Sequence, residues 1–157
     1  MGFEPGGIAD KLGNRYEGRW VVKQLLRLLN EEILSITIEL IGPNEQGVDL
    51  LIVKKDGTRQ LQQCKARLGS SENWSIAELK NKGILLHLKN HLTRDFQQEF
   101  ALVSPIAAQN LADICESARN SNDNPKDFYQ YQIQNIGRDR RELFRKFCVG
   151  MELDLTE

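Results

Sequence analysis

The spacing of apolar residues along this chain predicts an α/β fold. Residues 15–30 repeat apolar positions at helical spacing, 34–41 alternate, and 48–53 form a short apolar run. Ser75 and Glu78 have the spacing of a capping box, which predicts the start of a second long helix. The expected elements are helices at 15–30, 75–92 and 106–118, and strands at 34–41, 48–53, 60–67 and 100–103.

The pattern weakens beyond residue 119. Residues 120–125 favour turns, and the apolar residues of 128–136 show no clean period before a helix predicted at 138–149. We expect residues 120–157 to be a helical extension packed on a core of residues 6–119. The whole chain of 157 residues is then expected to be a single domain, excised from a longer protein.

Composition narrows the class of protein. With 40% hydrophobic residues and no apolar run long enough for a membrane span or signal peptide, we expect a soluble, cytoplasmic protein. The cysteines Cys64, Cys115 and Cys148 are odd in number and lack Cys-x-x-Cys spacing, which indicates reduced thiols rather than disulfides or a zinc ribbon.

The net charge is −1, but the basic residues are unevenly placed. Arg15, Arg19, Lys23 and Arg27 recur every four residues and should line one side of the first helix. Residues 137–146 form a second basic cluster. Either group could contact nucleic-acid phosphates, or both could be solvated faces.

The hairpin between the second and third predicted strands sets the register of the candidate site. Asp-Gly between apolar runs is a strong hairpin signal. A three-residue loop at 55–57 places Asp49 opposite Gln63, with Lys65 on the same side. A two-residue loop would instead put Asp49 opposite Cys64 and send the other two side chains to the opposite face.

On the first register, these residues suit a metal-dependent reaction. The carboxylate of Asp49, the amide oxygen of Gln63 and the backbone carbonyl of Cys64 are oxygen ligands of the kind that Mg²⁺ or Mn²⁺ prefers. Lys65 could orient an attacking water and offset charge on a phosphate. Taken singly, Asp49 could be a strand-end turn residue and Lys65 a solvated edge residue.

Asp49 followed by Gln63-Cys64-Lys65 resembles the PD-(D/E)XK, or restriction-endonuclease-like, superfamily, in its Gln-x-Lys (Mrr-like) form. The resemblance implies an αβββαβ core with a mixed central sheet flanked by helices, and a Mg²⁺-dependent DNA endonuclease. It also implies that Glu17 on the first helix completes the metal site. Residues 6–9 with the helix that follows are similar to the amino-terminal nuclease effector domains of bacterial antiviral STAND-type NTPases.

The resemblance further implies partners. Double-stranded DNA is the expected substrate, and the basic residues expected to contact it are Arg15, Arg19, Lys23 and Arg67. Self-association into a dimer or tetramer is expected for activity, and an NTPase or sensor region is expected in a longer chain. Gln63 stands where the family more often has Glu, which leaves an alternative: a catalytically inactive nucleic-acid-binding or oligomerisation module of a larger sensor.

Two further interpretations stay open from sequence. Glu17 could complete a capping box with Asn14 at a helix start, or face the sheet as a metal ligand. His87 and His91 are four residues apart and could share a zinc ion, but no third ligand accompanies them. We expect these histidines at the surface or at the edge of the second helix's apolar stripe.

Overall fold

The computed structural model describes residues 5–38, 40, 42, 46–66, 72–95, 97–122 and 124–153, and of residues 5–14 the backbone. The chain is α/β, as predicted. Its elements in order are α1 (Pro5–Leu29), β1 (Ile33–Ile38), β2 (Leu50–Lys54), β3 (Arg59–Cys64), α2 (Ile76–Asn81), α3 (Ile84–Arg94), β4 (Gln98–Val103), α4 (Gln109–Arg119), α5 (Pro125–Asp127), the π-helix η1 (Phe128–Gln134) and α6 (Arg138–Gly150).

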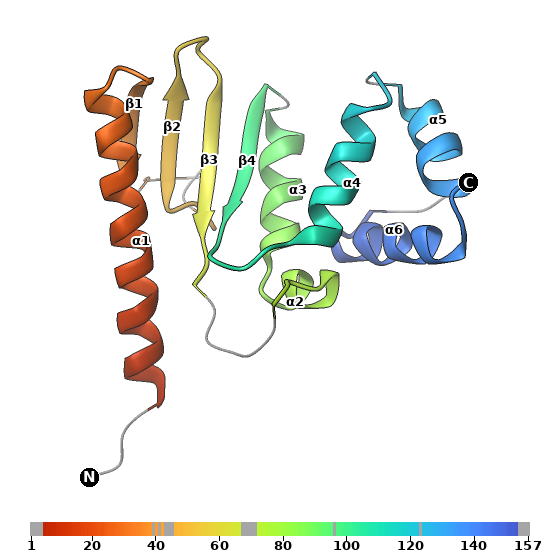
Figure 1. Ribbon diagram of the computed structural model, residues 1–157, viewed down its shortest axis with the longest axis horizontal. Helices are drawn as coiled ribbons and strands as arrows, with labels where there is room; N and C mark the ends of the chain where they lie inside the picture. Colours follow the sequence, from red (N-terminus) through yellow and green to blue (C-terminus); the bar gives the residue numbers. More distant parts are fainter. Residues whose placement is uncertain are drawn as a thin grey trace. The chain divides into compact units, whose positions relative to one another are not determined.

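The four strands form one mixed sheet in the order β1-β2-β3-β4 (Figure 1). The first two neighbouring pairs are antiparallel, and β3 pairs with β4 in parallel. A parallel pair needs a crossover connection, which α2 and α3 supply here. The prediction of a mixed sheet flanked by helices, with a helical C-terminal part, is therefore confirmed.

The β2–β3 hairpin has the longer loop. The N–H of Lys54 donates to the carbonyl of Thr58 at 2.9 Å, and Gly57 has the positive φ of 85° that the bulge position needs. Leu50 pairs with Gln62, and the N–H of Asp49 donates to the carbonyl of Gln62 at 2.9 Å, so Asp49 lies beside the end of β3. The predicted loop length and the pairing of the two strands are confirmed.

Alternation along the strands separates the two faces of the sheet. We call them the α1 face and the α3 face, after the helix that packs on each. On the α1 face, Leu50, Cys64 and Val103 form a buried cluster that Tyr16 and Trp20 of α1 cover. On the α3 face, the buried cluster comprises Leu40, Val48, Leu51 and Leu61, and the partly buried Phe100 packs against it.

Helix α1 begins at Pro5, well before the predicted start at residue 15. Gly6 and Gly7 favoured a loop over the opening turns, because glycine is a poor helix former. Asn14 therefore lies inside the helix and cannot be its N-cap. The capping-box interpretation of Glu17 is wrong.

The helix predicted at 75–92 is two helices. Its start is as expected, because Ser75 and Glu78 form a reciprocal capping box. The break comes at Gly83, whose φ of 71° is left-handed and ends α2 before α3 begins. This break separates the capped turn from the helix that carries both histidines.

The chain divides into two compact units. Unit 1 comprises Met1–Ser70 with His87–Ile106, and unit 2 comprises Ser71–Leu86 with Ala107–Glu157. Every candidate site residue lies in unit 1. The expected single-domain organisation stays a prediction.

Unit 2 is helical. Residues 128–136, whose apolar positions have no helical period, contain the π-helix η1, whose wider turn explains the missing 3.6-residue repeat. Phe128 packs edge-on against Phe144 of α6 with ring centroids 5.5 Å apart. Arg140 of α6 donates to the carbonyl of Asp113 at 2.9 Å, so part of the second basic cluster is engaged within the unit.

No helix in the described part of the chain has a stretch long and apolar enough to cross a membrane. The cytoplasmic location stays a prediction.

Candidate functional site

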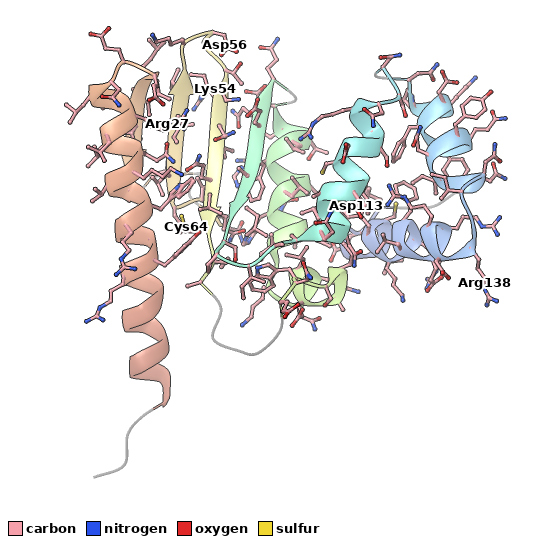
Figure 2. All side chains as sticks on the ribbon, in the orientation of Figure 1. Arg27, Lys54, Asp56, Cys64, Asp113 and Arg138 are labelled. Atoms are coloured by element: carbon pink, nitrogen blue, oxygen red, sulfur yellow. The ribbon has the colours of Figure 1, made fainter. Side chains whose placement is uncertain are left out.

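The site predicted from sequence lies where β2 begins and β3 ends. Asp49 directly precedes β2, and its Oδ2 accepts a hydrogen bond from the N–H of Cys64 at 2.5 Å. Lys65 follows β3, and its N–H donates to the carbonyl of Val103 at 2.8 Å. Figure 2 shows Cys64 at the end of β3 away from the hairpin, which Asp56 marks. Asp49 and Lys65 are thus tied by backbone contacts to the same end of the sheet.

Gln63 is buried, at 1% exposure, on the α3 face. Its Nε2 lies 3.2 Å from Nδ1 of His87 on α3. Its Oε1 has no hydrogen-bond partner among the described residues. An unpaired buried amide oxygen costs about 1–3 kcal/mol, so the Oε1 of Gln63 is an acceptor that a ligand could satisfy.

The charges around Cys64 show which side chains come together. Burial first, and then the carboxylates of Asp49 and Glu17, raise the pKa of the Cys64 thiol to about 12, with Lys65 acting in the opposite direction. Both carboxylates and the lysine therefore act on one thiol. Glu17 of α1 therefore lies within electrostatic range of Cys64.

Tyr16 belongs to the same neighbourhood. Burial raises the pKa of its hydroxyl, and the nearby Cys64 thiol adds to the effect. The Tyr16 hydroxyl therefore stays protonated and uncharged at physiological pH, and its side chain packs against the cluster that contains Cys64.

The donor set fits a hard divalent cation, with one difference from a carboxylate-rich site. The described residues contain no group of three or more His, Cys, Asp or Glu side chains placed to hold a metal. The candidate ligands are instead two carboxylates, Glu17 and Asp49, with the amide oxygen of Gln63 and the carbonyl of Cys64. All are oxygen donors, which suits Mg²⁺ or Mn²⁺, and the orphaned Oε1 of Gln63 is the acceptor that such a cation would satisfy.

Sequence reasoning missed the role of the two histidines. His91 is 3% exposed, stacks on Phe100 and bonds through Nε2 to the carbonyl of Gln46 at 2.9 Å. His87 is half-buried beside Gln63, and burial, followed by His91 and Lys65, lowers the pKa of its ring. The expectation of surface or stripe-edge positions is wrong for His91, which is a core residue. Their four-residue spacing on one helix face was the available signal.

Both histidines contact the turn that leads to Asp49. A Cβ built on Gly47 would overlap the ring of His87, and Gly47 has a φ of 71°. Glycine is therefore required here by its backbone conformation and by the close approach of the ring. Helix α3 holds the turn ahead of Asp49 against the sheet.

The basic residues of α1 divide into two groups. Arg15, Arg19 and Lys23 are exposed, as a phosphate-binding row requires, and the two arginines line a shallow surface hollow of about 480 Å³. Arg27 is instead engaged, donating to Gln24 at 2.9 Å and to Glu32 at 3.1 Å. Arg67 lies outside the described residues.

The α1 face carries a separate hydrogen-bonded row of side chains. Trp20 Nε1 donates to Gln62 Oε1, and Gln62 Nε2 donates to Gln60 Oε1, each at 2.7 Å. Gln60 then donates to Glu99 at 2.7 Å, and Lys54 bonds the same carboxylate at 2.6 Å. A cleft of about 370 Å³ between α1 and the sheet opens along this row, and Trp20, Gln60 and Gln62 line it.

Comparisons with protein-family models, with curated proteins and with solved structures find no match to this chain.

Proposed function

We propose that this chain is a metal-dependent DNA endonuclease that hydrolyses phosphodiester bonds. The observation that carries the proposal is the buried Oε1 of Gln63, which has no hydrogen-bond partner among the described residues and lies at the end of the sheet where Asp49 and Lys65 are held. Oxygen donors beside a lysine at one end of a sheet can support phosphodiester hydrolysis when a divalent cation draws them together.

Glu17, Asp49 and Gln63, with the carbonyl of Cys64, would hold Mg²⁺ or Mn²⁺. When bound, such an ion supplies positive charge against a phosphate oxygen and lowers the pKa of a coordinated water. The contact of Asp49 with the N–H of Cys64 keeps its carboxylate at the end of the sheet. Burial of Gln63 keeps its amide from turning freely, which preserves the geometry of the site between substrates.

Lys65 has two roles in the proposed reaction. Its positive charge lowers the pKa of both the Cys64 thiol and the His87 ring, so the ammonium lies within electrostatic range of both groups. It orients the water that attacks phosphorus and offsets the negative charge that builds on the phosphate as the oxygen of the leaving strand departs. Double-stranded DNA is the proposed substrate, with phosphates along the exposed row Arg15, Arg19 and Lys23.

A second candidate is a DNA-binding module that does not cut. Two carboxylates with a neutral amide give a less anionic ligand set than three carboxylates, while the exposed basic row is unaffected. This candidate keeps DNA binding that weakens with salt but shows no cleavage.

Self-association is part of the proposal, because cutting both strands requires two copies of a single site. Beyond Arg19, helix α1 exposes apolar residues beside Lys23, the last member of the exposed basic row. Exposed apolar residues continue from there onto β1, an edge strand of the described sheet, and are Val22, Leu26, Leu29, Leu34 and Ile38. We propose a second copy of this chain as the occupant of this surface, and Leu29→Lys should lower the native mass measured for the oligomer.

Cleavage of supercoiled plasmid tests the function. The native chain is compared with Asp49→Ala and Lys65→Ala in Mg²⁺ and in Mn²⁺, and Lys55→Ala on the exposed hairpin is the matched lysine control. We expect nicking or linearisation by the native chain and the control, and a loss of about 10²-fold or more in both site variants. DNA binding by all four proteins without cleavage by any would establish the second candidate instead.

A further inference from the structure

The amide of Gln63 can present only one of its two ends to the site. An amide has a donor end and an acceptor end, whereas a carboxylate presents oxygen in either orientation. Nε2 of Gln63 lies 3.2 Å from Nδ1 of His87, and Oε1 is the end without a partner among the described residues. The contact with His87 therefore determines whether Gln63 presents Oε1 or Nε2 to the site.

This arrangement requires one tautomer of His87. Nδ1 accepts from the amide only when it carries no proton, which places the ring proton of the neutral form on Nε2. If Nδ1 carried the proton, the amide would turn over and present its NH₂ group in place of Oε1. An NH₂ group has no lone pair to offer a cation.

The ring of His87 is held in place by the turn before Asp49. The ring lies so close to Gly47 that a Cβ at that position would overlap it. The next turn of α3 secures the same segment, because His91 bonds the carbonyl of Gln46 at 2.9 Å. The ring thus has little freedom to move away from Gln63.

We propose that His87 is a positioning residue, which fixes the amide of Gln63 with Oε1 toward the bound divalent cation and so allows a neutral amide to serve as a ligand. The inference rests on the proposed function, since it requires a cation at Glu17, Asp49 and Gln63. It adds a residue that touches neither cation nor DNA. It also makes His87 necessary only while residue 63 is glutamine.

A double-mutant cycle on cation binding tests this dependence. The dissociation constant for Mn²⁺, without DNA, is measured by the paramagnetic resonance of the free ion. The proteins are the native chain, His87→Leu, Gln63→Glu and the double variant. We expect His87→Leu to weaken Mn²⁺ binding about 10–100-fold when residue 63 is glutamine, the range found for residues that orient metal ligands. In the Gln63→Glu background, the same change should alter affinity less than about 3-fold, because a carboxylate needs no orientation.

The outcomes separate the two proposals. Equal losses in both backgrounds would overturn the positioning role while leaving the metal site intact. Absence of Mn²⁺ binding by both the native chain and Gln63→Glu would overturn the metal site, and the inference with it.

A second measurement needs no substitution and covers the case in which His87→Leu fails to fold. The ¹⁵N spectrum of the native chain with labelled histidine reports the protonation of each ring nitrogen. An unprotonated Nδ1 that accepts a hydrogen bond at His87 supports the proposal, and a protonated Nδ1 overturns it.

Discussion

Gln62 and Gln63 are neighbours on β3 with nearly the same burial, at 2% and 1% exposure, yet they have opposite hydrogen-bonding situations. On the α1 face, both ends of the Gln62 amide are engaged, one by Trp20 and the other by Gln60. On the α3 face, only one end of the Gln63 amide has a partner within the described part of the chain. Burial does not distinguish these two amides, whereas the state of their oxygen atoms does.

The largest difference between the two glutamines is expected in catalysis. Gln63→Met keeps the shape of the side chain but removes the oxygen, so plasmid cleavage should fall about 10³-fold, or about 4 kcal/mol in the activation barrier. Gln62→Met, the matched control, should keep cleavage within about 3-fold, since its amide contacts only the row on the α1 face. Equal losses of cleavage in the two variants would contradict the proposal that only the glutamine on the α3 face serves the reaction.

The α3 face should be the less tolerant of added volume. Gly47→Ala combines left-handed strain with overlap of the His87 ring, and should lower the free energy of unfolding by about 3 kcal/mol. Gly57→Ala is the control, because Gly57 also has a positive φ but open space around it, and should cost about 1 kcal/mol. Urea unfolding measures the loss of stability in both variants. Equal losses would mean that the His87 ring moves aside at little cost.

Without metal, the two glutamines should also differ in stability. Gln62→Met leaves the indole N–H of the half-buried Trp20 without its acceptor, and should lower the free energy of unfolding by about 2 kcal/mol. Gln63→Met removes an oxygen that has no partner among the described residues, so stability should stay within about 1 kcal/mol or rise. Chemical denaturation in a chelator checks this, and a larger loss for Gln63→Met would contradict it.

The smallest effect is expected at the far end of the row on the α1 face. The ion pair with Lys54, then the bond from Gln60, lowers the pKa of Glu99, so this contact stabilises the fold above the carboxyl's ordinary pKa and is lost as pH falls through the lowered value. The pair is partly exposed, at 34% and 44%, so Glu99→Gln should cost less than about 1 kcal/mol at pH 7. The difference between native and variant should shrink as pH falls below about 4.

Short local patterns in the sequence predicted much of the fold. Asp56-Gly57 predicted the hairpin and its register, and Ser75 with Glu78 predicted a helix start, because both depend on a few neighbouring residues. The extent of α1 and the break at Gly83 were missed. Glycine weakens a helix without always ending it, and packing decides between the two outcomes.

The candidate site was predictable only in its strand residues. Asp49, Gln63 and Lys65 follow from one hairpin register, so the order of residues along the chain is enough to group them. His87 could not be added to them, because its contact with Gln63 joins two elements separated by a crossover. Its part in the site depends on how α3 packs on the sheet, which periodicity does not specify.

Cys64 gives the molecule a chemical reporter of its own. Burial first, and then Asp49 and Glu17, keeps its pKa at about 12, so the thiol is almost entirely protonated at neutral pH. A bound cation that neutralises those carboxylates should lower the pKa of the Cys64 thiol, because it removes their contribution to that pKa. The alkylation rate of Cys64 should therefore rise when the carboxylates are neutralised, so this native thiol can report on the occupancy of the site without a substrate, a fluorophore or an introduced label.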